Sequence, residues 1–449
     1  MNKKIIYIIV LILFASASGF IILKYKNDEK RNEARIYELL PRQGMLAQYA
    51  EWPMIQNNAK QLLKKIKENT NDLKSKTRLI ALYLQEARVT GNLQYYNVAA
   101  MRLVKDILKK DPNDFQALTF KTLIFLSQHH FADGLIVAEQ LRNSYPYDAF
   151  VHGMLVDANV EMGNYDSAVA NSERMVSLRP DLRSYSRISY LREIYGDNAG
   201  AIAAMKMAVD AGAAGDESTE WTRIQLAKLY EHTGQMKYAE MHYTIALNER
   251  PNYPYALAGL GRISASQKEY DKAITYYLKA DSIINNYSFE EELAEVYRAS
   301  NQNDKADKLY KNILEKMLNA SKNTNSSDSI GHYADREIAY ACLGVQDYEK
   351  ALDHAMLEYN RRPDNIDVNE TVAWVYYCKG DFQKALPYVN VGLKTNCKNP
   401  ILLCRSGLIY ANAGEKDKAK MFLQEGLKDD PNISQSLKAE AIKTLQTLQ

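Results

Sequence analysis

The chain has 449 residues, of which 46% are hydrophobic and 25% are charged, a composition typical of globular proteins with ample apolar surface to bury. Lysine and arginine number 57 and aspartate and glutamate 55, so the formal net charge at pH 7 is only +2. Proteins that bind nucleic acid are usually strongly basic, and we therefore expect no nucleic acid as a partner.

An apolar run close to the N-terminus is the first feature along the chain. Residues 1–4 form a basic leader with Lys3 and Lys4, and residues 5–23 contain no charged side chain. A helix of this length crosses the ~30 Å core of a bilayer and exceeds the apolar part of most cleaved signal peptides, about 7–15 residues. We expect an uncleaved, single-pass transmembrane signal anchor over residues 5–23 and a charged stalk over residues 24–41.

Cleavage of this segment is the alternative. Ala15, Ser16 and Ala17 form a small-residue triplet of the kind that a signal peptidase accepts, and cutting there would release a soluble periplasmic adaptor. The apolar residues 20–23 would then be exposed to water, which favours the anchor. A very short basic leader normally stays in the cytoplasm, so we expect the rest of the chain to be periplasmic or otherwise outside the cytoplasm.

Residues 221–251 contain two apolar stripes at helical spacing, separated by a glycine. The stripes are Leu226, Ala227 and Tyr230, then Ala239, Tyr243 and Ala246. Gly234 lies between them, where one helix should end and the chain should turn, and Pro251 ends the second helix. The pattern predicts two short antiparallel helices, in which Ala239 and Ala246 are small enough for close approach.

This stretch resembles the tetratricopeptide repeat, a helix–turn–helix unit of 34 residues. The pattern recurs after 34 residues and again after 33 more, at Leu260, Gly261, Ala273, Tyr277 and Ala280, then at Leu293, Ala294, Tyr297, Ala306 and Tyr310. A register held over many units predicts a helical solenoid. The resemblance implies an all-α fold, a right-handed superhelix of about ten repeats, some of them degenerate.

The remaining boundaries follow from this register. The expected segments are capping helices or a degenerate repeat at 42–78, a repeat array at 79–318, a polar loop at 319–331, a continued array at 332–434 and a capping helix at 435–449. The loop is expected because residues 319–329 are polar and low in complexity.

Motifs for catalysis or metal binding are absent from the sequence. There is no glycine-rich phosphate loop, no zinc-protease motif and no serine-hydrolase elbow. His129 and His130 are adjacent, but they fall in an expected turn, and adjacent side chains point apart on a helix. We expect no enzyme activity, no cofactor and no metal.

The four cysteines form no CxxC pair. Cys342 and Cys378 fall on expected first helices and are read as buried thiols. Cys397 and Cys404 are close enough in sequence for a bridge in an oxidising compartment, although their spacing does not require one.

In tetratricopeptide domains, positions 2, 5, 9 and 12 of each first helix line a concave groove. The resemblance places at these positions Trp221, Lys228, Tyr255, Arg262, Glu291, Glu295, Arg298, Tyr333, Arg336, Tyr340, Glu370, Trp374 and Tyr377. Aromatic residues and arginine are enriched in binding hot spots, and an extended peptide or helix of mixed charge would suit them. The alternative is that Trp374 and Tyr340 pack against the neighbouring repeat. No unit has the Lys at position 5 and Asn at position 9 that chaperone-tail binders use.

These observations predict a membrane-anchored scaffold that binds a partner protein or peptide in its groove. A sequence rich in Lys, Asn and Tyr, with such a leader, suggests the bacterial envelope and a role in its assembly or in secretion. The alternative is a carbohydrate-binding accessory of polysaccharide export, in which groove aromatics stack on sugar rings. The sequence does not indicate an oligomeric state.

Overall fold

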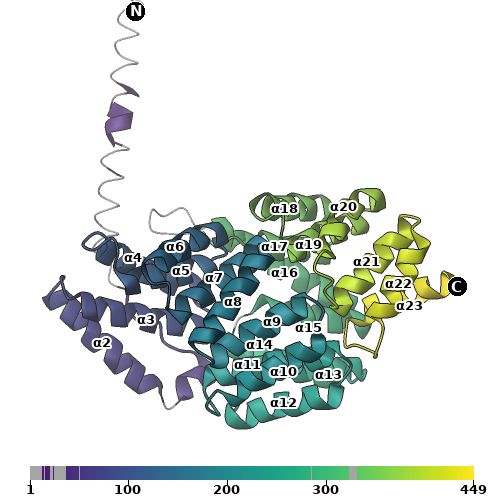
Figure 1. The fold of residues 1–449 in the computed structure, drawn as a ribbon, viewed down its shortest axis with the longest axis horizontal. Helices are drawn as coiled ribbons and strands as arrows, with labels where there is room; N and C mark the ends of the chain where they lie inside the picture. Colours follow the sequence, from purple (N-terminus) through teal and green to yellow (C-terminus); the bar gives the residue numbers. More distant parts are fainter. Residues whose placement is uncertain are drawn as a thin grey trace, which may run out of the picture.

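The computed structural model describes residues 13, 14, 16–20, 24, 37–49, 51–284, 286–322 and 331–448 (Figure 1). Every regular element within these residues is a helix, so the expected all-α class is confirmed for them. The elements are η1 (Gly44–Gln48), α2 (Trp52–Glu68), α3 (Leu73–Thr90), α4 (Leu93–Leu108), α5 (Phe115–Ser127), α6 (Phe131–Ser144), α7 (Ala149–Met162), α8 (Tyr165–Leu178), α9 (Leu182–Ile194), α10 (Asn198–Asp210), α11 (Glu217–His232), α12 (Met236–Glu249), α13 (Pro254–Ser266), α14 (Tyr270–Ile283), α15 (Tyr287–Ala299), α16 (Asn303–Lys322), α17 (Asp335–Gly344), α18 (Tyr348–Arg361), α19 (Ile366–Cys378), α20 (Phe382–Gly392), α21 (Pro400–Asn412), α22 (Lys416–Gly426) and α23 (Gln435–Thr447).

Successive helices form antiparallel hairpins, from α3 with α4 to α21 with α22, and each hairpin packs on the next to build a solenoid (Figure 1). Small residues make the packing close. Ala239 and Ala246 of α12 are fully buried, and the Tyr243 ring on the same helix lies against Gly259 of α13. A Cβ at Gly259 would lie 2.4 Å from that ring, so only glycine fits there. The predicted stripe of small and aromatic residues is therefore the contact between hairpins.

Hairpin turns use residues that tolerate the left-handed backbone region. Gly163, between α7 and α8, has φ of 80°, and Gly234, between α11 and α12, has φ of 69°. His129 occupies the same place between α5 and α6 with φ of 61°. The expectation that His129 and His130 form a turn is confirmed.

The solenoid winds back on itself, so that its second superhelical turn contacts the first. Hydrogen bonds join residues 201 to 205 positions apart in sequence, such as Asn365 with the Val160 carbonyl and His130 with the Gly331 carbonyl. We call this contact the seam. It joins the hairpin turns at 128–131, 161–165, 194–197 and 231–234 to the loops at 331–334, 362–366, 396–399 and 429–433. In Figure 1, α7 and α8 accordingly lie beside α17 and α19.

The N-terminal segment differs from the expected stalk where it is described. The Tyr83 hydroxyl donates to the Tyr37 carbonyl, and the Leu40 N–H donates to the Tyr96 hydroxyl at 3.0 Å. Arg42 is buried and pairs with Glu86 at 2.7 Å. Because the backbone of this segment is hydrogen-bonded to α3 and α4, its end belongs to the folded body. The short helix η1 and the long helix α2 stand where two short capping helices were expected.

Two other expectations concern segments that the structure describes only in part. Helix α16 continues to Lys322, so the first residues of the expected loop at 319–331 are helical, while residues 323–330 lie outside the described part. The expected membrane span at residues 5–23 falls mostly outside it as well. Among the residues that are described, none of the helices combines the length and the apolar character needed to cross a bilayer. The C-terminal helix α23 buries Leu437 and Ala441 against the last hairpin, as a cap does.

Candidate functional site

The first helix of each hairpin faces the interior of the superhelix, and three adjoining cavities lie there. The large cavity has a volume of about 740 Å³ and is lined by α11, α13, α15 and residues 432–436. The middle cavity, of about 550 Å³, is lined by α15, α16, α17, α19, α21 and residues 434–440. These two share the lining residues Glu292, Glu295, Arg298, Ile401, Ser434 and Ser436. We call them together the lumen.

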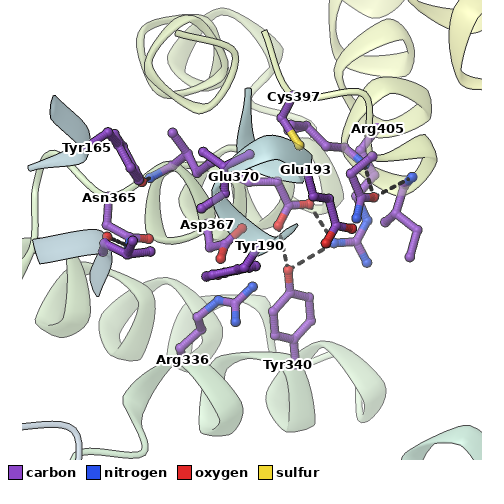
Figure 2. Close-up of a pocket in the computed structure, with 16 residues that line it drawn as sticks. Tyr165, Tyr190, Glu193, Arg336, Tyr340, Asn365, Asp367, Glu370, Cys397 and Arg405 are labelled. Carbon is purple, nitrogen blue, oxygen red and sulfur yellow. Dashed lines mark hydrogen bonds and ion pairs between the residues drawn. The ribbon is translucent and has the colours of Figure 1, made fainter. Parts of the chain in front are cut away.

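The seam cavity, of about 330 Å³, lies between the two superhelical turns (Figure 2). Tyr165, Tyr190 and Glu193 line it from the first turn. Arg336 and Asp367 are among the residues that line it from the second turn. It adjoins the middle cavity at Tyr340, Ile401 and Arg405, which line both.

Most charges in the lumen are paired with one another. Arg262 on α13 contacts Glu231 on α11 at 3.2 Å and Glu292 on α15 at 3.1 Å. Burial alone would lower the pKa of Arg262, but the two carboxylates hold it well above its ordinary value. The Tyr243 hydroxyl donates to Glu231, and the Tyr277 hydroxyl donates to Glu292 at 2.9 Å. This network ties three successive first helices together.

A second network fixes the predicted residues Glu295 and Arg298 on α15. Glu295 accepts from the Tyr310 hydroxyl at 2.6 Å. Arg298 donates to the Gly344 carbonyl at 2.6 Å, and its guanidinium carbon lies 4.6 Å from the centre of the Tyr310 ring. Both side chains therefore line the lumen while they brace α15 against α16 and α17.

Lys228 and Glu291 are the exceptions in the lumen. Among the described residues, no carboxylate lies within ion-pair distance of the Lys228 ammonium, and burial and Arg262 lower its pKa. One carboxylate oxygen of Glu291 is buried without a hydrogen-bond partner. Burial and the neighbouring Glu337 raise the pKa of Glu291 to about 7. A buried charge without a partner is costly, so these two groups favour a ligand that supplies one.

Other predicted groove residues lie in packed contacts. Trp221 meets the edge of Tyr255 with ring centres 4.9 Å apart, and neither residue lines a cavity described above. Tyr333 belongs to the seam, because its ring stacks on His130 at 3.9 Å and under the Arg361 guanidinium at 4.0 Å. Tyr255 and Tyr333 thus contribute to packing, whereas 40% of the surface of Trp221 remains exposed.

Of the two predicted aromatic residues on α19, Trp374 lines a cavity and Tyr377 makes a packing contact. Trp374 lines the middle cavity and stacks on Tyr377 with ring centres 4.7 Å apart. The Arg405 guanidinium lies 4.7 Å from the Trp374 ring centre, and the Tyr377 hydroxyl donates to Glu440 of α23 at 2.7 Å. Trp374 therefore presents a partly covered ring to the lumen, while Tyr377 binds the capping helix.

Around the seam cavity, Tyr340 and Glu370 form a network with Arg405. Glu370 accepts from Arg405 at 2.6 Å and from the Tyr340 hydroxyl at 2.8 Å, and Arg405 also donates to Tyr340 at 2.9 Å. Burial alone would raise the pKa of Glu370, but these partners hold it below its ordinary value. The carboxylate of Glu370 is thus ionised and fully engaged. Arg336 stands beside this network, and within the described residues its one hydrogen bond goes to Thr371, at 3.0 Å.

Sequence reasoning missed several residues that line the cavities. Tyr190 and Glu193 occupy positions 9 and 12 of the repeat that contains α9, and Glu231 occupies position 12 of the repeat that contains α11. The same positional rule, applied to every unit, would have found them. Glu292 and Arg405 stand at position 6, which the rule does not include, and no signal in the sequence marks them.

The structure offers no metal centre in the part that it describes, since no cluster of three or more His, Cys, Asp or Glu side chains there could hold an ion. All four cysteines are free thiols. Because all four are free, no bridge joins Cys397 to Cys404. Cys342, Cys397 and Cys404 are buried, and Cys378 is half-buried.

Comparison with known proteins identifies two of the hairpins by sequence. A tetratricopeptide repeat model matches residues 254–287 and 401–433, which contain α13 with α14 and α21 with α22. The chain is 25% identical over 207 residues to the anaphase-promoting complex subunit CDC16 of Saccharomyces cerevisiae. The match covers 44% of this chain but only 22% of that protein, so the chain spans about a fifth of the length of this relative.

Solved structures with similar folds share little sequence. Human IFIT1, solved as a dimer with PPP-AAAA, has a TM-score of 0.43 and 14% identity, covering 85% of this chain and 89% of that one. A tetratricopeptide repeat protein from Parabacteroides merdae has a TM-score of 0.33 and 18% identity, covering 59% and 98%. MamA has a TM-score of 0.29 and 16% identity, covering 35% and 90%. These scores are too low to inform function. The described part of the chain is thus an all-helical solenoid with tetratricopeptide repeats.

Proposed function

We propose, from the tetratricopeptide repeats that the chain contains, that this protein is an interaction scaffold whose lumen receives an extended segment of a partner protein. Repeats of this type generally mediate protein–protein interactions. The observation that supports the lumen as the binding surface is the pair Lys228 and Glu291. They have opposite charge, and among the described residues neither forms an ion pair, whereas the other charges of this space are engaged.

The chemistry of the lumen describes the partner segment. Lys228 calls for a carboxylate on the segment, and Glu291 calls for a basic group. Val296, Ala299 and Ile401 line the large cavity, so apolar side chains suit the space near Lys228. A segment that crosses both cavities therefore needs an acidic residue, an apolar residue and a basic residue. The scaffold is preformed, so only the partner loses conformational entropy on binding.

The location of the scaffold is a separate part of the proposal. The uncharged run at residues 5–23 supports a single-pass anchor, with the repeats outside the cytoplasm. In that place the partner would be a protein of envelope assembly or secretion. Fractionation of native cells tests this part alone. Recovery of the full-length chain in the soluble fraction, or of a mature N-terminus near Ser18, would refute the anchor.

Crosslinking in native membranes followed by mass spectrometry would identify the partner. Calorimetric titration with its segment then tests the lumen. We expect Lys228→Met and Glu291→Gln each to weaken binding about tenfold or more, because each leaves a charge of the segment unpaired in a desolvated site. Lys237→Met and Glu240→Gln change the same residue types on the exposed face of α12 and should leave the affinity unchanged. Equal effects of the lumen and surface variants would refute the proposal.

Carbohydrate binding is less favoured by the lumen. A sugar ring needs an open aromatic face, whereas Trp374 already packs on Tyr377 and Arg405. A glycan array run beside the crosslinking would detect such binding, and its loss in Trp374→Ala would support the carbohydrate alternative instead.

A further inference from the structure

The seam cavity has a different character from the lumen. Its volume of about 330 Å³ suits a small molecule rather than a chain segment. Its walls come from both superhelical turns, with Tyr190 and Glu193 on α9 of the first turn and Arg336, Tyr340 and Asp367 on α17 and α19 of the second. Figure 2 shows the Arg336 guanidinium and the Tyr190 ring directed into the same space.

Arg336 offers unused donors to this cavity. Its guanidinium carries five N–H groups, and the Nε–H donates to Thr371 at 3.0 Å. In the described part of the chain no carboxylate lies within 4.0 Å of Arg336, and no further hydrogen bond from it is found. The planar end of an arginine binds a carboxylate through two parallel hydrogen bonds. Arg336 therefore keeps N–H donors that no described residue accepts, although the neighbouring Asp367 raises its pKa.

Two carboxylates of the same cavity also accept no side-chain hydrogen bond from the described residues. Asp367 makes no ion pair and no side-chain hydrogen bond with any described residue. In the part of the chain that is described, the one charged partner of Glu193 is His232, at 3.4 Å, and that contact is an ion pair only when the imidazole is protonated. Glu370 differs from both, because Arg405 and Tyr340 satisfy it. Among the described residues, the cavity thus holds one guanidinium with unused donors and two carboxylates that accept no hydrogen bond, and Asp367 is near enough to raise the pKa of Arg336.

Tyr190 adds an aromatic surface beside these charges. It lines the cavity, and 41% of its surface is exposed. Burial, with Asp367 and Glu161, raises its pKa well above the ordinary value, so the phenol stays neutral. A neutral aromatic ring attracts an ammonium group that approaches its face.

We propose that the seam cavity binds a free α-amino acid. The ligand's carboxylate pairs with Arg336, and its ammonium group pairs with Asp367 and Glu193 beside the Tyr190 ring. A simple anion would leave both carboxylates without a partner and add to their negative charge. A simple amine would leave Arg336 without one. A small zwitterion satisfies all three groups, and the cavity is too small for a long peptide.

This ligand would also close the superhelix. Its carboxylate is held by the second turn and its ammonium partly by Glu193 of the first turn, so binding links the two across the seam. Ligand binding to the closed form alone shifts the equilibrium toward that form. The amino acid would therefore stabilise the wound state of the scaffold whatever the lumen holds.

Thermal unfolding of the full chain with each of the twenty common L-amino acids, followed by calorimetry on those that raise the melting temperature, tests the proposal. We expect at least one amino acid to raise the melting temperature. For the best binder, its decarboxylated amine and its deaminated acid should each bind at least about tenfold more weakly. If none of the twenty binds, or if either analogue binds as tightly as the parent, the proposal is wrong.

Variants assign the two ends of the ligand. Arg336→Gln should weaken binding of the amino acid about tenfold or more while leaving the affinity for the decarboxylated amine unchanged. Asp367→Asn should weaken the amine and the amino acid but spare the deaminated acid. Arg192→Gln, an exposed change on α9, should alter none of these affinities. Arg336→Lys keeps the positive charge but lacks the paired N–H donors of the guanidinium. It replaces Arg336→Gln if that variant does not fold, and it should still bind the amino acid more weakly than the native chain does.

An equal loss for the amino acid and both analogues in Arg336→Gln would show that Arg336 only maintains the structure and would overturn the assignment. Lys228→Met, which tests the lumen, should leave amino-acid binding unchanged. The two proposals therefore fail independently.

Discussion

The α-carbon of Gly163 faces the peptide carbonyl of Asp364, one superhelical turn later. A Cβ at Gly163 would lie 2.4 Å from both the carbonyl carbon and the carbonyl oxygen of Asp364. Gly234 stands in the same relation to Asp429, where the distance from an added Cβ to the carbonyl oxygen would be 1.7 Å. These hairpin turns thus reverse the direction of the chain and also contact the second superhelical turn. Glycine is required there twice, for its backbone conformation and for the space.

We predict that Gly163→Ala destabilises the protein more than Gly380→Ala does. Gly163 and Gly380 have φ of 80° and 81°, so alanine is strained equally at both, by about 1 kcal/mol. Only Gly163 has a neighbour, since nothing lies within 4 Å of a Cβ at Gly380. Overpacking at the seam should cost a further 1–3 kcal/mol or so. Thermal unfolding compares the two variants directly, and equal losses of melting temperature would show that the seam does not form in solution.

We predict that Asn365→Ala loosens the seam more than Asn399→Ala does, because the Asn399 side chain lies in a seam loop but makes no hydrogen bond across the seam to any described residue. Both side chains cap a helix, α19 and α21 respectively, by accepting from backbone N–H groups. Asn365 also donates across the seam to the carbonyls of Val160 and Glu161, at 3.2 and 3.1 Å. Losing a cap costs about 1 kcal/mol in either variant, and the buried carbonyls add about 1–3 kcal/mol for Asn365 alone.

Small-angle scattering and hydrogen exchange measure how far the seam opens in the two variants. In Asn365→Ala we expect a larger radius of gyration and faster exchange of the Ile366 amide, which donates to the Tyr165 hydroxyl at 2.9 Å in the native protein. The Asn399→Ala variant should resemble the native protein in both. If the two variants behave alike, the hydrogen bonds across the seam contribute nothing measurable.

The hairpins were predictable because their contacts are local. Ala239 packs within its own repeat, and the Tyr243 ring meets Gly259 of the next, so a period near 34 residues records the packing. The contacts across the seam leave no such periodic pattern in the sequence. Their partners lie about 200 residues apart, and they meet only because small rotations between hairpins accumulate to one full turn. Tyr333 was therefore predicted to face the groove, although the structure stacks it on His130.

The candidate site was predictable in part for the same reason. The positional rule selected Lys228 and Arg336, which line cavities in the structure, because side-chain direction follows helix periodicity. Whether an inward charge is paired depends on the side chains of neighbouring repeats. Arg262 meets Glu231 and Glu292, whereas Lys228, one repeat earlier, meets no carboxylate among the described residues. The sequence alone does not show which inward-facing charges are paired.

We predict that Glu291→Gln stabilises the protein much more at pH 8 than at pH 5. The pKa of Glu291 in the folded chain is about 7, against an ordinary value of 4.5. The folded state therefore binds this proton more tightly than the unfolded state does. Its contribution is fully present below pH 4.5 and is lost as the pH rises through 7. The loss is at most about 3 kcal/mol, and glutamine avoids it because it carries no charge.

Melting temperatures measured from pH 5 to pH 8 test this prediction. The difference between Glu291→Gln and the native chain should grow as the pH rises from 5 to 7 and level off above pH 7. Glu240→Gln, an exposed change on α12, should show no such trend. A difference that is constant with pH would mean that Glu291 is already ionised at pH 5.

We predict that all four cysteines titrate as free thiols in the unfolded protein, but that only Cys378 reacts readily in the folded one. Burial raises the pKa of Cys397 and Cys404 to about 12 and that of Cys378 to about 11, so each thiol stays protonated near pH 8. The thiolate is the reactive form, and access then decides the rate. Cys378 is half-buried and lines the middle cavity, whereas Cys404 is fully buried.

A disulfide reagent that releases a coloured thiolate should show one fast phase, absent in Cys378→Ser, and four thiols in denaturant. Two thiols in denaturant would instead reveal a bridge between Cys397 and Cys404, and α21 would then have to move to let Cys404 reach its partner.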